Sequence, residues 1–66
     1  MAVAKVTEII ASSNKSFEDA MKQGISRAEK TLKNIRGAWI KDQEVVIASG
    51  KVTSYKVRML VTFVLK

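Results

Sequence analysis

The chain has 66 residues, of which 47% are hydrophobic and 27% charged, and it contains no proline, cysteine or histidine. A chain this short buries only about 60% of the surface that it exposes when unfolded, so its own core stabilises it weakly. Disulfides are excluded, and a structural zinc site is not expected without cysteine or histidine. Oligomerisation is the remaining source of stability, and we expect the chain to self-associate.

The same missing residue types argue against catalysis. Cysteine nucleophiles, imidazole bases and Ser-His pairs are impossible, and no organised base can be assigned to any serine. We therefore expect a protein that is not an enzyme. Residues 1–5 do not resemble the start of a signal peptide, and the longest apolar runs fall far short of the ~20 residues that span a bilayer. We expect a cytoplasmic protein with no membrane partner.

Twelve Lys and Arg residues against six Asp and Glu residues give a formal net charge of +6. Such a balance suits nucleic acid, an anionic membrane surface or an anionic small ligand, and equally a surface whose lysines keep the protein dispersed. The basic positions are scattered, and no aromatic residue alternates with them as stacking on single strands requires. Nucleic acid is therefore not expected as a partner.

The first half of the chain predicts a strand followed by a helix. Residues 3–12 mix β-branched apolar residues with charged ones, as strands do. From about residue 15 to 36 the apolar residues recur at three- and four-residue steps, which predicts one face of a helix. Ser16 with Asp19 fits a capping box at the start of this helix, and Gly37 fits its end.

One glycine falls on the apolar face of the predicted helix. Gly24 costs about 1 kcal/mol relative to alanine inside a helix. Its position on the face that we expect to be buried indicates that the helix approaches a strand closely there.

The second half of the chain predicts two strands, residues 38–48 and 51–65, joined by a turn at Ser49-Gly50. In the last strand the odd positions from 55 to 65 are apolar and should pack on the helix, while the even positions begin polar and become apolar at Leu60 and Val64. A strand that is apolar on both faces is buried on both faces. Since one helix covers only one face of the sheet, neighbouring subunits should cover the other. We expect one β-α-β-β domain over residues 1–66.

The sequence resembles the dodecin family over nearly its whole length. The resemblance depends on several short segments that occur in this order and at this total length. They are Lys5-Val6-Thr7-Glu8-Ile9-Ile10, Ser16-Phe17-Glu18-Asp19-Ala20, Arg27-Ala28-Glu29-Lys30-Thr31-Leu32, Asn34-Ile35-Arg36, Tyr55-Lys56-Val57-Arg58 and Val61-Thr62-Phe63.

The resemblance implies an α+β fold in which a three-stranded antiparallel sheet wraps partly around one helix. It also implies assembly of twelve copies into a hollow homododecamer that sequesters or stores a ligand. Many dodecins bind flavins such as riboflavin and FMN, stacked between paired tryptophans at a two-fold axis, whereas others bind calcium and lack the flavin tryptophan. The resemblance thus implies a flavin ligand, with a flavin-free dodecin that binds a divalent cation or has a structural role as the alternative.

Two signature positions of flavin-binding dodecins differ in this chain. The position of the stacking tryptophan is Gly37, and the position of a glutamine that bonds to the flavin ring is Lys56. The tryptophan of this chain, Trp39, lies two residues further along, and strand alternation puts it on the same face as Gly37. Trp39 can therefore stack on an isoalloxazine near the same axis, or it can anchor a subunit contact, where tryptophan is enriched.

Four charged residues complete the candidate site. Lys56 and Arg58 share a strand face and can bind an FMN phosphate or the flavin carbonyls; alternatively they pair with Asp42 and Glu44 on the neighbouring strand. Asp42 and Glu44 are also weak candidates for a calcium or magnesium site, but calcium takes six to eight oxygen ligands, which one chain does not offer.

Overall fold

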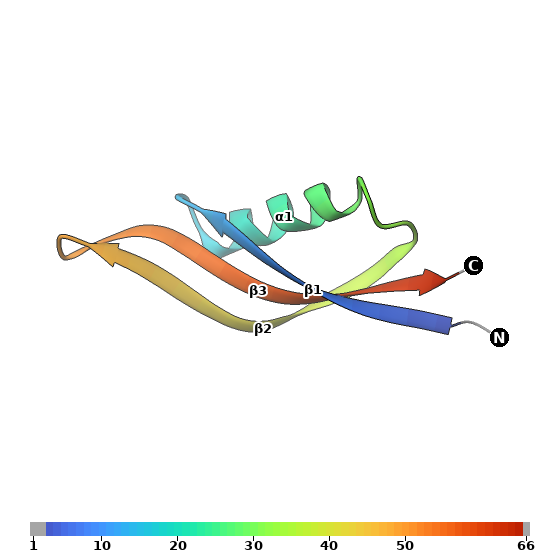
Figure 1. The fold of residues 1–66 in the computed structure, drawn as a ribbon. Helices are drawn as coiled ribbons and strands as arrows, with labels where there is room; N and C mark the ends of the chain where they lie inside the picture. Colours follow the sequence, from blue (N-terminus) through green and yellow to red (C-terminus); the bar gives the residue numbers. More distant parts are fainter. Residues whose placement is uncertain (1–2, 66) are drawn as a thin grey trace.

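The structure is a computed structural model that describes residues 3–65; Met1, Ala2 and Lys66, which fall within the predicted domain, lie outside the described residues. The elements follow the order β1 (Val3–Ser13), α1 (Phe17–Ala28), β2 (Ile35–Ala48) and β3 (Lys51–Leu65). The three strands form one antiparallel sheet in the order β1-β3-β2, with α1 against one face (Figure 1). The predicted β-α-β-β architecture is therefore confirmed.

The start of the helix agrees with the sequence and its end does not. Ser16 is the N-cap, and its hydroxyl accepts a hydrogen bond from the backbone N–H of Asp19. The helix ends at Ala28, eight residues before the predicted end. There the Ala28 carbonyl accepts bonds from the N–H groups of both Thr31 and Leu32, which closes the last turn.

The strand β2 begins at Ile35, three residues earlier than predicted, because its first residues pair with β3. Asn34 adopts a left-handed φ of 61° and turns the chain, and Ile35 then lies opposite Phe63. Gly37 therefore lies inside a strand and does not terminate the helix, which corrects the prediction. Long-range pairing here outweighs the helical periodicity of Leu32 and Ile35.

The hairpin turn was predicted correctly. Ala48 and Lys51 are paired, which leaves Ser49 and Gly50 as a two-residue loop, and both have a positive φ, 54° and 75°. Two positive φ values in succession match the strand twist of a tight hairpin, and Gly50 adopts its value without strain.

The core lies between α1 and the odd-numbered residues of β3. Val57, Met59 and Val61 are fully buried, and Phe63 is nearly so. Tyr55 meets the ring of Phe17 edge to face at 5.2 Å between centroids. The predicted inward face is thus confirmed except at Leu65, which is about half exposed because α1 does not extend over the end of the strand.

The predicted close approach at Gly24 is confirmed. A Cβ atom added to Gly24 would lie 2.8 Å from the Cβ of Ala11 on β1 and 2.8 Å from the Cε of Met59 on β3. Only glycine lets the helix backbone come this near to the sheet.

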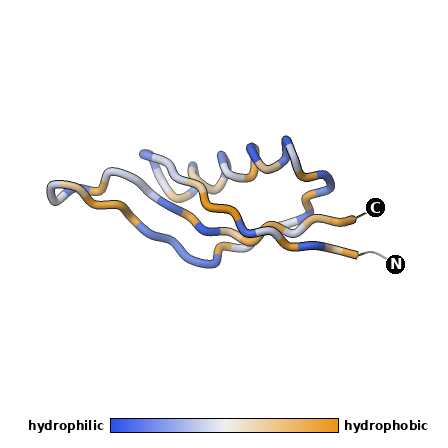
Figure 2. The backbone as a smooth tube through the Cα atoms, in the orientation of Figure 1, coloured by the Kyte–Doolittle hydropathy of each residue, from blue (hydrophilic) through white to orange (hydrophobic). Residues whose placement is uncertain are grey.

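The face of the sheet opposite α1, here called the open face, has no covering element in the part of the chain that the structure describes. The molecule measures 51 × 19 × 14 Å, so the 12-residue helix, about 18 Å long, covers a fraction of it. Figure 2 shows hydrophobic residues distributed along all three strands. Four apolar side chains of the open face are at least 40% exposed: Val6, Ile10, Trp39 and Val46. Apolar exposure on this scale is consistent with self-association.

A hydrogen-bonded corner joins β1 to α1 at Asp19. The Ser13 hydroxyl donates to Asp19 Oδ2, and the Gln23 amide donates to the same oxygen. The bond from Ser13 lowers the pKa of Asp19 below its ordinary value of 3.8, since it favours the ionised form.

Because the folded-state pKa of Asp19 is depressed, its stabilising contribution is present above about pH 4 and is lost as the pH falls through the folded value. We therefore expect Asp19→Asn to lower the melting temperature at neutral pH and to flatten its fall with acid. Thermal unfolding followed by circular dichroism, at about five pH values between pH 2 and pH 7, tests this expectation. A variant whose melting temperature falls with acid as steeply as that of the wild type would contradict the assignment.

Candidate functional site

The register of the sheet brings the candidate residues of β2 and β3 onto the open face. Trp39 lies opposite Leu60 and Gly37 lies opposite Thr62, both even-numbered positions of β3. The prediction that Trp39 and Gly37 share a face is therefore confirmed. An irregularity between Ile40 and Asp42 then shifts the alternation by one residue.

This bulge decides which face the acidic residues occupy. Without it, Asp42 and Glu44 would alternate onto the face opposite to that of Trp39. With it, Asp42 lies opposite Arg58 and Glu44 lies opposite Lys56. All six predicted site residues, Gly37, Trp39, Asp42, Glu44, Lys56 and Arg58, consequently lie on the open face.

Trp39 is available to a ligand or to another subunit. Its side chain is 51% exposed. Apart from Gly37 and its two chain neighbours, no atom of residues 3–65 lies within 4 Å of the position that a Cβ would take at Gly37, so the sheet is open beside the indole ring. A flat aromatic surface next to an unfilled space can accept a planar ring or the side chain of a neighbouring subunit.

The charged residues of the open face pair with one another. Arg58 lies 3.7 Å from Glu8 on one side and 3.7 Å from Asp42 on the other. Lys41, the bulged residue, reaches Glu8 at 3.4 Å, and Lys56 reaches Glu44 at 3.7 Å. The pairing of Lys56 and Arg58 with the acidic residues of β2, weighed from the sequence, is thus present.

Arg58 keeps hydrogen-bonding capacity in this network. Its Nε atom is buried and has no hydrogen-bond partner within residues 3–65. Both of its carboxylate neighbours, Glu8 and Asp42, lie beyond hydrogen-bond distance, so its ion pairs are electrostatic contacts. The Arg58 side chain is 38% exposed, so its terminal guanidinium nitrogens, and not the buried Nε, are the groups that can donate to an incoming oxygen.

Sequence reasoning missed Glu8 and Lys41 as members of this site. Glu8 was assigned only to the first strand, but its pairing with Leu60 places it on the open face. Lys41 reaches the network because it is the extra residue of the bulge. Lys41 lies two residues after Trp39, and strand alternation would place both side chains on the same face. This spacing was the one sign in the sequence that Lys41 belongs to the site.

The two residues predicted as weak candidates for a calcium or magnesium site, Asp42 and Glu44, do not form a metal site by themselves. Asp42 and Glu44 each have a cationic neighbour, and a divalent cation would have to displace Arg58 or Lys56. No group of three acidic residues within residues 3–65 is arranged to hold a metal ion. A cation site on this face would need oxygen ligands from further subunits.

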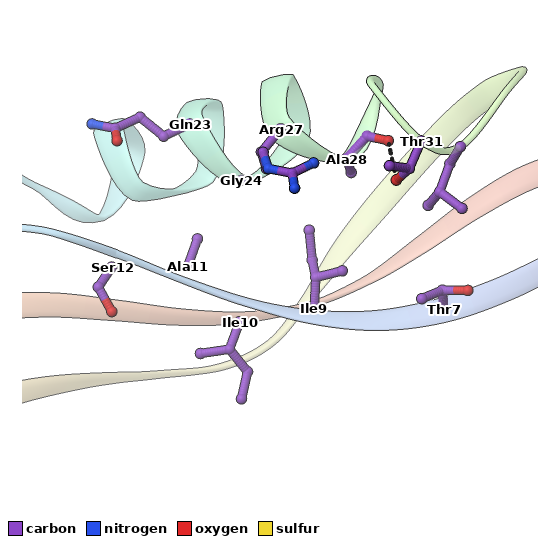
Figure 3. A pocket seen from close by; sticks show the side chains of 11 residues that line it. Thr7, Ile9, Ile10, Ala11, Ser12, Gln23, Gly24, Arg27, Ala28 and Thr31 are labelled. Atoms are coloured by element: carbon purple, nitrogen blue, oxygen red, sulfur yellow. Dashed lines mark hydrogen bonds between the residues drawn. The ribbon is translucent and has the colours of Figure 1, made fainter.

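A separate pocket of about 530 Å³ lies between the edge strand β1 and α1. Figure 3 shows Ile9 and Ala11 directed from β1 toward the helix, while Ile10 and Ser12 point to the other side of the strand. No residue predicted from the sequence as a ligand-binding or metal-binding candidate lines this pocket.

No helix in residues 3–65 is both long enough and apolar enough to cross a membrane.

The fold, the length and the sheet with its single helix are those of one family. The family model described as Dodecin matches residues 3–66. The chain belongs to the dodecin family, as the resemblance implied.

Individual relatives agree with this assignment. The chain is 32% identical over 63 residues to a Mycobacterium tuberculosis protein named Calcium dodecin, covering 96% of this chain and 89% of that protein. A crystal structure of that calcium dodecin, described as calcium-chelating with a novel calcium-binding site, gives a TM-score of 0.84 at 32% identity over 97% of this chain and 91% of that one.

Two further dodecin structures match still more closely in shape. The dodecin from Streptomyces davaonensis is 28% identical with a TM-score of 0.95, covering 98% of this chain and 96% of that one. A point mutant of the Thermus thermophilus dodecin is 29% identical with a TM-score of 0.94, covering 100% of this chain and 98% of that one.

Proposed function

We propose that this protein is a non-enzymatic, self-assembling binding protein that sequesters or stores a flavin on the open face of its sheet. The observation that carries the proposal is the exposed indole of Trp39 beside the unfilled space at Gly37. Membership of the dodecin family supports a binding and storage role.

A planar isoalloxazine suits this surface for a physical reason. Offset stacking between aromatic rings contributes about 0.5–1.5 kcal/mol beyond the burial of apolar area. The missing side chain at Gly37 leaves room for a ring that extends past the indole. In a symmetric assembly, Trp39 of two copies can enclose the ligand from both sides, which replaces the stacking position that Gly37 leaves empty.

Arg58 and Lys56 complete the proposed site as hydrogen-bond donors. The flavin carbonyls and an FMN phosphate are acceptors, and the side chains of Lys56 and Arg58 are each 38% exposed in the described chain. Trp39 and Arg58 lie on the same face, two register positions apart. One ligand that stacks on the indole can therefore also reach the guanidinium.

We expect riboflavin and FMN fluorescence to be quenched on titration with the protein and to saturate at a fixed ratio of flavin to subunit. Trp39→Leu should weaken binding at least about tenfold because the stacking surface is lost, whereas Trp39→Phe should keep most of it. Light scattering on each variant verifies that assembly is intact. Unchanged flavin fluorescence at micromolar protein would remove flavin as the ligand.

Calcium binding is the second candidate function. It is supported by the 32% identity to a calcium dodecin. It is also supported by three carboxylates on the open face, those of Glu8, Asp42 and Glu44. Isothermal titration with calcium chloride discriminates between the two functions. A calcium protein should give saturable heat that Asp42→Asn weakens, with no response to flavin. Magnesium serves as the comparison ion, since it demands a tighter octahedral geometry.

We expect the assembly to contain twelve copies, as the dodecin fold implies. A 7.3 kDa chain should then elute with a light-scattering mass near twelve subunits. Adding a charge to the exposed apolar surface near the hairpin, with Val46→Glu, should shift the mass toward smaller species. A wild-type protein that runs at the mass of one chain would contradict the proposal.

A further inference from the structure

We propose that the pocket between β1 and α1 is a second ligand site, separate from the open face, which takes a small amphipathic anion with its carboxylate at Arg27. The pocket is a groove open to solvent with a volume of about 530 Å³. Small-molecule sites commonly have volumes of about 300–1,000 Å³, an apolar lining and a few polar groups that fix orientation. The pocket between β1 and α1 has each of these features.

The floor of the pocket is apolar. Ile9 and Ala11 of β1 point toward α1, and Gly24 and Ala28 face them from the helix (Figure 3). Leu32, just beyond the helix, extends this surface. Because Gly24 and Ala11 are already in close contact, an alkyl chain or an aromatic ring lies along the outside of this apolar surface, where it removes apolar area from water.

The polar groups of the pocket define the charge of the ligand. Arg27 lies above Ile9 in Figure 3, and in residues 3–65 no carboxylate lies within 4 Å of its guanidinium. Thr7 of β1 contributes a hydroxyl group at the same pocket. A free guanidinium binds carboxylates through two parallel hydrogen bonds, so it selects an anion over a neutral molecule.

Two further observations favour an anion at this place. The last helical carbonyl groups, which would repel an anion, are already occupied: Arg27 O accepts from the Lys30 N–H, and Ala28 O from the N–H groups of Thr31 and Leu32. The open face holds three cations and three carboxylates in mutual contact, so the net charge of +6 resides on the rest of the chain. A positive surface raises the local concentration of anionic ligands.

Isothermal titration of the assembled protein with octanoate, and with octanol as the neutral analogue of equal length, tests the proposal. We expect octanoate to saturate at one molecule per chain. Arg27→Gln should weaken octanoate about five- to tenfold and leave octanol unchanged, because only the carboxylate meets the guanidinium. Arg27→Lys should restore part of the affinity. Lys22→Gln removes the same charge from α1 outside the pocket and should have no such effect.

Trp39→Leu separates this site from the proposed flavin site, because it should weaken flavin binding and leave octanoate binding intact. Likewise, Arg27→Gln should leave flavin binding intact. Three results would overturn the proposal: no saturable octanoate binding, as when a neighbouring copy fills the pocket; equal octanoate affinity in the wild type and Arg27→Gln; or loss of octanoate binding in Trp39→Leu.

Discussion

Met59→Ala should lower the free energy of unfolding by about 2–5 kcal/mol, the largest effect that we expect from any single truncation in this chain. Met59 is fully buried at the centre of the core, where its register partners are Ile9 on β1 and Ile40 on β2. Its terminal methyl group reaches the surface of α1 at Gly24. Truncation leaves a cavity between the sheet and the helix that a 12-residue helix cannot collapse to fill.

Urea denaturation followed by far-UV circular dichroism measures this effect, at one fixed protein concentration because unfolding is coupled to assembly. Lys51→Ala, on the same strand but exposed at the hairpin, is the control and should change stability by less than about 0.5 kcal/mol. A loss below about 1 kcal/mol in Met59→Ala would show that the core does not depend on this side chain.

Gly24→Ala should also destabilise the protein, although alanine is the better helix former by about 1 kcal/mol. The new methyl group would meet the Cβ of Ala11 and the Cε of Met59 at 2.8 Å. The end of the Met59 side chain has little room to move, because it lies in a packed core. The Ala11 Cβ cannot move independently, because it is fixed to the strand backbone. The helix must therefore move away from the sheet, and overpacking of this kind costs about 1–3 kcal/mol.

The matched control for Gly24 is Ser26→Ala, an exposed position of the same helix. There the propensity gain acts alone, and stability should stay equal or rise by a few tenths of a kcal/mol. Chemical denaturation of the two variants side by side gives the comparison. If Gly24→Ala proved as stable as Ser26→Ala, the close approach of α1 to β1 would be refuted.

The sequence predicted the elements of this fold well wherever a local signal was strong. The alternation of β3, the Ser49-Gly50 turn, the Ser16 cap and the glycine at the helix contact all appear as expected. The first three are set by neighbours in the chain: a period of two, a positive φ and an orphan N–H group.

The end of the helix could not be predicted in the same way. Leu32 and Ile35 continue the helical spacing of apolar residues, yet Ile35 is the first residue of β2 and pairs with Phe63. The competing interaction comes from a residue 28 positions away, which no local pattern reveals. Asn34, which tolerates a positive φ, was the available sign of the turn.

The structure places the six candidate residues on one face of the sheet, but the sequence did not reveal how they meet. The pairing of Arg58 with Asp42 depends on a bulge at Lys41 that shifts the alternation of β2, and simple counting would have put Asp42 on the opposite face from Trp39. Glu8 joins the site through the register of a third strand. The pocket between β1 and α1 was not anticipated, because it arises from how the helix lies across the strand.

The most direct test of the proposed function is a crystal structure of the assembled protein grown with riboflavin. We expect the isoalloxazine ring to stack on Trp39 at the open face, with Arg58 in hydrogen-bond contact with a flavin oxygen. A structure in which Trp39 is packed in a seam between subunits, with riboflavin absent or bound elsewhere, would contradict the proposed site.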